Sequence, residues 1–141
     1  MAVTNGTKAI RLLKGSAQDA RAVEMMMELG RLLAQGDPWA RKRAEELFFE
    51  ATKPKNAPAL PFFELGRLYR SQGELQRAVW CFRQAVERDP NLAEAYLDLG
   101  RALRGKPQWR KEAKAALRRY LKLRPDSEEA PKVRALIEKM R

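Results

Sequence analysis

One short pattern occurs three times along the chain at a nearly constant interval, and it constrains the fold more than any other feature. An acidic residue is followed by Leu-Gly and then Arg, at Glu28–Arg31, Glu64–Arg67 and Asp98–Arg101. The three glycines are 36 and 34 residues apart. An interval of this length is typical of proteins that stack one supersecondary unit on the next. The sequence therefore predicts an array of similar units.

Each unit contains a second periodic segment after a short polar turn. Its apolar residues are spaced by four and then three positions, which places them on one face of a helix. They are Ala44, Phe48 and Ala51, then Ala78, Phe82 and Ala85, and then Ala113, Leu117 and Tyr120. A glycine inside a helix costs about 1 kcal/mol relative to alanine, so its repeated use implies a neighbouring helix too close for a Cβ. We therefore expect an all-α chain of antiparallel helices that pack closely.

Turn and capping residues divide this chain into separate helices. Asp37-Pro38 combines a capping residue with a proline in the first turn, and the segments at Pro90 and Pro125 each end one helix before the next begins. No segment alternates with period two for long, so no sheet is expected. The predicted helices span 18–35, 38–52, 58–72, 75–88, 92–104, 107–123 and 127–140, with a further short one near 6–14.

The repeat resembles the tetratricopeptide repeat. In Ala59–Leu92 the matching residues are Phe62, Leu65-Gly66, Tyr69, Gly73, Ala78, Phe82, Ala85 and Pro90. The third repeat matches similarly but has Tyr120 where a small residue is usual, and the lengthened first repeat is similar to the Sel1-like variety. The resemblance implies a right-handed solenoid of helical hairpins, with three repeats within 18–126 (about 20–57, 59–92 and 93–125). Residues 1–17 then form an N-terminal segment, and residues 127–141 form a capping helix.

The composition of the chain argues against enzymatic activity and against a metal site. The chain has no His and a single cysteine, Cys81, so the commonest general base, a disulfide and a cysteine zinc site are missing. It also has no glycine-rich phosphate loop and no metal-ligand spacing. We therefore predict a binding protein without enzymatic activity, cofactor or metal. No apolar run approaches the roughly 18 residues of a membrane span, and we expect a soluble, cytoplasmic protein.

The family resemblance implies that the first helices of the repeats line a concave groove in which partners lie. Arginines recur there, and a guanidinium binds a carboxylate with two parallel hydrogen bonds. The predicted groove residues are Met27, Arg31, Arg67, Arg70, Arg101 and Arg104. One hypothesis is therefore an adaptor that holds an acidic segment of another protein. In the alternative, Glu28, Glu64 and Asp98 pair with the arginines and leave a mixed, solvated face.

A comparison with chaperone-binding members of the family limits this hypothesis. Those members bind a terminal carboxylate with Lys, Asn and Arg at set columns. Here the same columns hold Met27, Arg31, Glu64, Glu94 and Asp98. The lysine and asparagines of that clamp are missing, so we do not expect binding to heat-shock chaperone tails by this mechanism.

Two other surfaces offer different functions. The chain has 29 Lys and Arg against 18 Asp and Glu, a net charge of +11, and its C-terminal third is the most basic part. There Lys111, Lys114, Arg118 and Lys122 form one helical stripe that is suited to nucleic-acid phosphates or an anionic membrane, or that is simply solvated. Trp80 occupies a column that is usually polar and faces the convex side. It is a candidate contact with a partner or, if the protein self-associates as a homo-oligomer, with a second copy, although partial burial also explains it.

Overall fold

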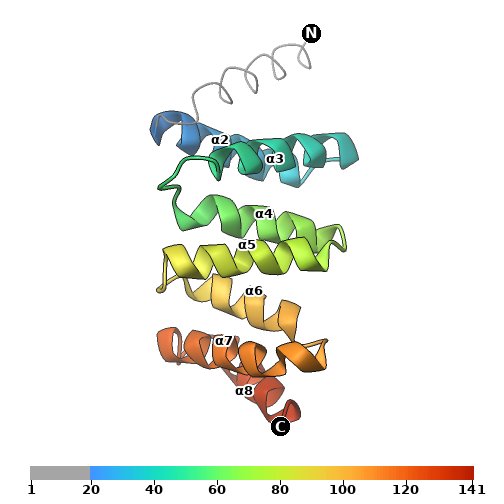
Figure 1. The fold of residues 1–141 in the computed structure, drawn as a ribbon, viewed down its shortest axis with the longest axis vertical. Coiled ribbons are helices and arrows are strands. Elements are labelled where there is room, and N and C mark those ends of the chain that lie inside the picture. Colours follow the sequence, from blue (N-terminus) through green and yellow to red (C-terminus); the bar gives the residue numbers. More distant parts are fainter. Residues whose placement is uncertain (1–19) are drawn as a thin grey trace.

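A computed structural model describes residues 20–141. Within that range the chain forms seven α-helices, one short 3-10 helix and no strand. The elements are α2 (Ala20–Ala34), α3 (Pro38–Ala51), α4 (Ala59–Ser71), α5 (Leu75–Arg88), α6 (Ala93–Leu103), η1 (Pro107–Trp109), α7 (Arg110–Leu123) and α8 (Ala130–Lys139). They follow one another along the long axis of the molecule (Figure 1). The helix expected near 6–14 lies outside the described residues.

Successive helices pair into three hairpins, α2–α3, α4–α5 and α6–α7, and α8 packs on α7 at the C-terminal end. The repeated glycines bring the two helices of each hairpin together. A Cβ at Gly30 would lie 2.4 Å from Phe48 Cε1, one at Gly66 would lie 2.8 Å from Phe82 Cε1, and one at Gly100 would lie 2.5 Å from Leu117 Cδ2. No real Cβ fits at these distances. The prediction that a neighbour approaches too closely for a side chain is confirmed in all three repeats.

The core lies between and within the hairpins. The large member of each predicted triplet belongs to it, since Phe48, Phe82 and Leu117 are all buried. Tyr120 is also buried, and its hydroxyl hydrogen-bonds with the Ser127 hydroxyl, the two oxygens being 2.9 Å apart. This bond between α7 and the turn that follows it accounts for a tyrosine where the family usually has a small residue.

Most of the predicted helix bounds agree with the structure to within two residues, and the ends have identifiable causes. The Ala40 amide donates to Asp37 Oδ1 at 2.9 Å, so Asp37 caps α3 with Pro38 in the first turn. The segment 107–123 begins as the 3-10 turn η1 before α7. The last helix, expected from 127, begins at Ala130 with Pro131 in its first turn. Proline is tolerated in that turn and not further inside a helix.

Candidate binding surfaces

The first helices carry a ladder of arginines whose charges are partly neutralised across repeats. Arg31 Nε lies 3.4 Å from Glu64 Oε1, and Arg67 Nε lies 3.6 Å from Asp98 Oδ2. Arg101 Nη2 donates to Glu129 Oε2 at 2.6 Å. Each arginine thus pairs with a carboxylate about one repeat further along the chain rather than with the one three residues before it. The pairs of Arg31 and Arg101 are partly exposed and contribute about 0–1 kcal/mol each, so their main effect is on the local charge.

Asp98 is the buried member of this network. Its residue is only 8% exposed, and it is the only charged residue classed as buried within 20–141. Arg67 and Arg70 both approach it, Arg70 Nη1 at 3.4 Å from Oδ1. Burial raises the pKa of the Asp98 carboxyl above its usual value, although Arg67, Arg70 and Arg101 act in the opposite direction. The carboxylate is therefore held at a cost in hydration that its arginine partners only partly offset.

The arginines near the C-terminal end keep an excess of positive charge. Arg104 has no ion-pair partner among the described residues. It lines a hollow of about 310 Å³ between α6 and α8, together with Arg101, Lys132, Val133, Ala135, Leu136 and Lys139. A second hollow of about 250 Å³ is lined by Arg67, Arg70 and Ser71 on α4. Cations and apolar side chains therefore share one face over α4, α6 and α8.

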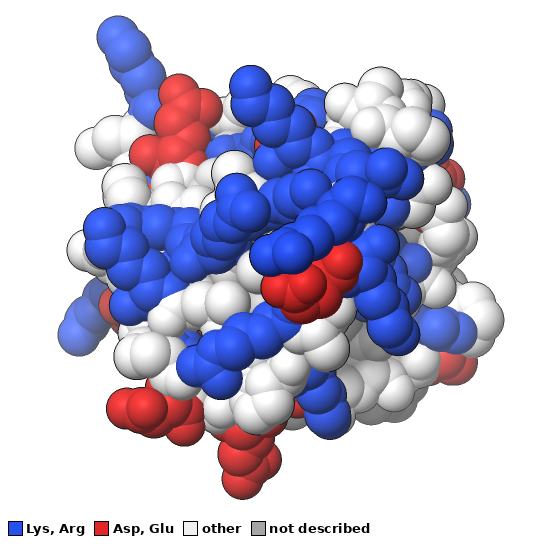
Figure 2. All heavy atoms as spheres, turned by 90° about the horizontal axis from the view of Figure 1, so that it is seen from below, with Lys and Arg blue, Asp and Glu red and all other residues white. Residues whose placement is uncertain are grey.

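The charge of the whole chain has the same bias. Residues 101–141 hold 14 Lys and Arg against 5 Asp and Glu, whereas residues 1–100 hold 15 against 13. Figure 2, a view of the C-terminal end, shows Lys and Arg side chains forming a nearly continuous band with few acids among them. The stripe of Lys111, Lys114, Arg118 and Lys122 belongs to α7, and none of these four has an acidic partner in the part of the chain that the structure describes.

Met27 has to be removed from the predicted groove residues. It is only 6% exposed and belongs to the core with Met26, whereas Met25 is the exposed member of the three. Met26 and Met27 lie four and three positions before Gly30, on the face that packs against α3. Their spacing from Gly30 could have shown from the sequence that Met26 and Met27 are buried and that Met25 is exposed.

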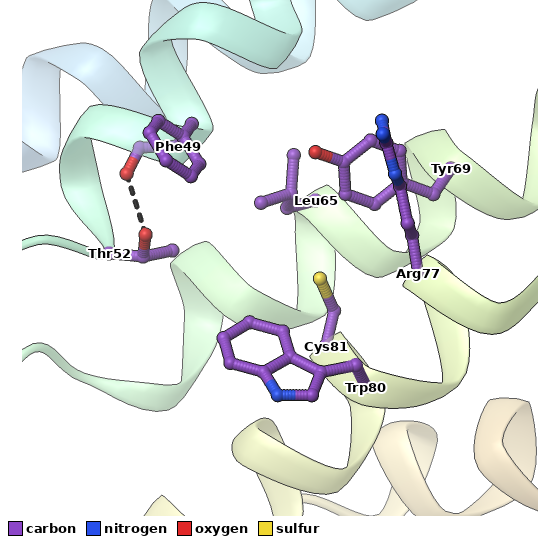
Figure 3. Close-up of a pocket in the computed structure, with 7 residues that line it drawn as sticks. All are labelled: Phe49, Thr52, Leu65, Tyr69, Arg77, Trp80 and Cys81. Carbon is purple, nitrogen blue, oxygen red and sulfur yellow. Dashed lines mark hydrogen bonds between the residues drawn. The ribbon is translucent and has the colours of Figure 1, made fainter. Parts of the chain in front are cut away.

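Trp80 is exposed, as a surface contact requires, and it borders an apolar hollow. Its side chain is 55% exposed and packs at one edge on Phe62, with ring centroids 6.0 Å apart. The hollow has a volume of about 410 Å³ and is lined by Phe49, Thr52, Leu65, Tyr69, Arg77, Trp80 and Cys81 (Figure 3). Among these residues, only Trp80 was predicted from the sequence to be a surface contact.

Three observations on the described residues concern metal binding, the cysteine thiol and membrane spans. They contain no group of three or more acidic or cysteine side chains that could hold a metal ion. Burial raises the pKa of the Cys81 thiol to about 12, so the thiol stays protonated at neutral pH and is a poor nucleophile. Within the same residues, no helix has the length and apolar character needed to cross a membrane.

Comparison with known proteins supports the architecture. A family model described as "TPR repeat", for tetratricopeptide repeat, matches residues 66–105. No curated protein matches the chain. Among solved structures, the tetratricopeptide domain of Arabidopsis OM64 aligns with a TM-score of 0.70 at 26% identity, covering 86% of this chain and 95% of that one.

Two further solved structures are similar at lower identity. The first tetratricopeptide domain of Spaghetti (RPAP3), bound to the HSP90 peptide SRMEEVD, gives a TM-score of 0.73 at 20% identity, covering 86% of this chain and 98% of that one. The TPR2B domain of yeast Sti1, in a complex with pHsp70, gives 0.69 at 17% identity, covering 84% of this chain and 94% of that one.

The fold and these matches define the class of protein: it is an all-α solenoid of helical hairpins, with three repeats and a C-terminal capping helix. Its repeats carry the glycine, alanine and aromatic columns of one family. Residues 66–105 match the tetratricopeptide-repeat model, and the described chain has the fold of solved tetratricopeptide domains. The likeness of its first repeat to the Sel1-like variety stays a prediction, as do the boundaries assigned to residues 1–17 and 127–141.

Proposed function

We propose that this protein is a protein-binding module that holds an acidic segment of a partner along its first helices. In a tetratricopeptide solenoid these helices line the concave face, and two of the similar domains are solved with chaperone partners, an HSP90 peptide and pHsp70. The observation that carries the proposal is the excess of cations over α4, α6 and α8. Among the described residues, the ion pairs of the cations there reach two carboxylates, Asp98 and Glu129; the six cations are Arg67, Arg70, Arg101, Arg104, Lys132 and Lys139.

The charge pattern also indicates which part of the face is used. Towards the N-terminal end, Arg31 is paired with Glu64, and Met27 is buried. Towards the C-terminal end, Arg104 and Lys139 have no ion-pair partner among residues 20–141 and lie beside the apolar Val133 and Leu136. This combination suits a segment that alternates carboxylates with apolar side chains. The columns of the chaperone clamp hold Glu64, Glu94 and Asp98, so the mode of binding differs from that clamp.

The test compares two variants with the same change in charge. Arg104→Glu plus Lys139→Glu reverses the groove, and Lys111→Glu plus Lys122→Glu reverses the stripe on α7. None of the four side chains has an ion pair in the described structure, so both variants should keep the wild-type helicity. The probe is a fluorescein-labelled 12-residue peptide with six acidic residues, followed by anisotropy. We expect the groove variant to lose at least tenfold in affinity and the stripe variant to lose little. Equal losses would reject the groove.

The α7 stripe supports a second candidate, the binding of nucleic-acid phosphates or of an anionic membrane, because its four cations have no acidic partner in the described structure. A 20-base-pair DNA duplex and vesicles containing phosphatidylserine are the probes. Affinity for either should fall steeply with salt and should be lost in the stripe variant, with the groove variant as its control. The cytoplasmic location remains part of the proposal, since a single cysteine fits a reducing compartment.

A further inference from the structure

We infer that the hollow between α3 and α5 is a second binding site, which takes an apolar face of a helical segment from a partner protein. It is independent of the acidic-segment proposal, because none of the residues that line it belongs to the cations over α4, α6 and α8. Phe49 on α3 and Trp80 on α5 stand at its edges and are 50% and 55% exposed, whereas Leu65, Tyr69 and Cys81 behind them are buried. Figure 3 shows these side chains surrounding an open space between the helices.

The next junction between repeats provides an internal comparison. Counted from Ala44, Ala78 and Ala113, the position of Phe49 in the first repeat corresponds to Arg83 in the second. In the same way, Arg77 corresponds to Glu112. Between α5 and α7, Arg83 and Glu112 form two hydrogen bonds, of 2.8 and 2.7 Å, that bridge the junction. Between α3 and α5 the same two positions hold Phe49 and Arg77, and no such bridge can form. The hollow therefore results from the residues at this junction rather than from the solenoid itself.

A third position also differs between the two junctions. Trp80 corresponds to Ala115 in the following repeat. Exposing a Trp and a Phe, where the next junction uses an alanine and an ion pair, leaves an apolar surface in contact with water. Such surfaces on a protein of known fold mark sites of interaction. Phe49 and Trp80 differ from the other exposed apolar residues in standing together at the edges of one hollow.

The size and shape of the hollow indicate its occupant. It has a volume of about 410 Å³ and adjoins a second hollow of about 290 Å³ lined by Lys42, Glu45, Glu46, Phe49 and Tyr69. Phe49 and Tyr69 belong to both, so the two form one groove. Two adjacent cavities suit two large side chains three or four positions apart on a helix, which is how amphipathic helices are recognised in apolar grooves.

The charges near the groove argue against an anionic ligand, and the charge of the whole chain argues against a second copy of the chain. Three acids near the groove, Glu45, Glu46 and Glu74, are balanced by Lys42, Arg43 and Arg77; Arg43 Nη1 lies 2.8 Å from Glu46 Oε1, and Arg77 Nε lies 3.6 Å from Glu74 Oε2. The groove therefore does not select an anion. The net charge of +11 opposes self-association through this groove.

The site can be removed by copying the next junction into this one. In the triple variant Phe49→Arg, Arg77→Glu and Trp80→Ala, the three residues become those of the corresponding positions at Arg83, Glu112 and Ala115. Because this arrangement already exists one repeat further along, the variant should fold with wild-type helicity. Should it melt early, the single substitution Phe49→Arg places a cation in the groove at a half-exposed position and serves as the second test. Trp39→Ala is the matched control, since Trp39 is 47% exposed and lies outside the groove.

The experiment selects partners from a phage-displayed library of 16-residue helical peptides, with four randomised positions on one face, against the full chain. We expect enrichment of peptides with large apolar residues at positions i and i+3 or i+4. Their affinity should fall at least tenfold on the triple variant and on Phe49→Arg. It should be unchanged on Trp39→Ala and on Arg104→Glu plus Lys139→Glu, and it should persist in 0.5 M salt. The inference is overturned if no such peptide is enriched, if the groove variants bind equally well, or if light scattering shows a dimer that Trp80→Ala dissociates.

Discussion

Gly66 illustrates how a single missing atom sets the distance between two helices. A Cβ at this position would lie 2.8 Å from Phe82 Cε1 and 3.1 Å from Cys81 Cβ, and both residues are buried. Replacing Gly66 by Ala would gain about 1 kcal/mol of helix propensity but would force the core apart, at about 1–3 kcal/mol. We expect Gly66→Ala to lower the free energy of unfolding by up to about 2 kcal/mol, the difference between these two effects, as measured by chemical denaturation.

Gly105 is the control for that substitution. A Cβ there would have no neighbour within 4 Å, and its φ is not in the left-handed region. Gly105→Ala should therefore leave the free energy of unfolding unchanged or raise it by up to about 1 kcal/mol, through the lower entropy of the unfolded chain. If the two substitutions had equal effects, close approach would not be the reason for the repeated glycines.

Asp98 allows a prediction that opposes the usual intuition about ion pairs. The pKa of its carboxyl is raised by burial despite three nearby arginines, so the folded state holds the proton more tightly than the unfolded state does. This penalty on folding is absent below the ordinary pKa of an aspartate, 3.8, and appears as the pH rises through the raised pKa. Asp98→Asn, which carries no charge, should therefore increase stability at pH 7, by less than about 1 kcal/mol.

The pH dependence separates this explanation from a simple loss of contacts. The advantage of Asp98→Asn over the wild type should shrink as the pH is lowered towards about 4, which parallel thermal melts can measure. The same substitution removes one of the two carboxylates beside the groove cations and should raise affinity for the acidic peptide. A variant that is less stable than the wild type at pH 7 would mean that the arginine pairs outweigh the burial of the carboxylate.

At the scale of elements, one hydrogen bond connects α7 to the turn that leads into α8. The Tyr120 hydroxyl and the Ser127 hydroxyl are 2.9 Å apart, and Tyr120 is buried. Tyr120→Phe keeps the ring but leaves Ser127 without this partner, and should lower the free energy of unfolding by about 1 kcal/mol. The double variant with Ser127→Ala should cost little more than either single variant. Additive losses in denaturation experiments would show that the two residues act separately.

The helices could be predicted from the sequence because their causes are local and repeated: glycine and alanine columns, an Asp37 cap, and prolines at the ends. The start of α8 was placed too early because Asp126 and Ser127 resemble a cap, whereas Pro131 sets the first turn. The pairing of Arg31 with Glu64, and of Arg101 with Glu129, depends on the spacing between repeats, which no single helix reveals. The apolar groove was readable in principle, since aligning the repeats shows Phe49 where the next one has Arg83.

For the whole molecule, the repeats separate two kinds of surface. The first helices of the C-terminal half carry cations in excess of their carboxylates, and the second helices of the N-terminal half carry a groove whose charges are balanced. Each surface is formed by contributions from at least two repeats, so neither exists in an isolated hairpin. Both surfaces therefore require the stacked array, and the stability of that array can be measured along the stack.

In native-state hydrogen exchange, the protection of backbone amides should decrease from the interior of the stack towards its C-terminal end. α5 has neighbours on both sides, because α4 pairs with it and α6 follows it, whereas α8 packs on α7 at the end of the stack. In a repeat array, opening an end breaks one interface and opening the interior breaks two. We expect amides of Ala130–Lys139 to exchange at least about tenfold faster than those of Leu75–Arg88, the factor that about 1.4 kcal/mol produces. Mass spectrometry of peptides from the two helices measures the ratio. Equal protection of the two helices would show that the chain opens as one cooperative unit, and that the end of the stack is no less stable than its interior.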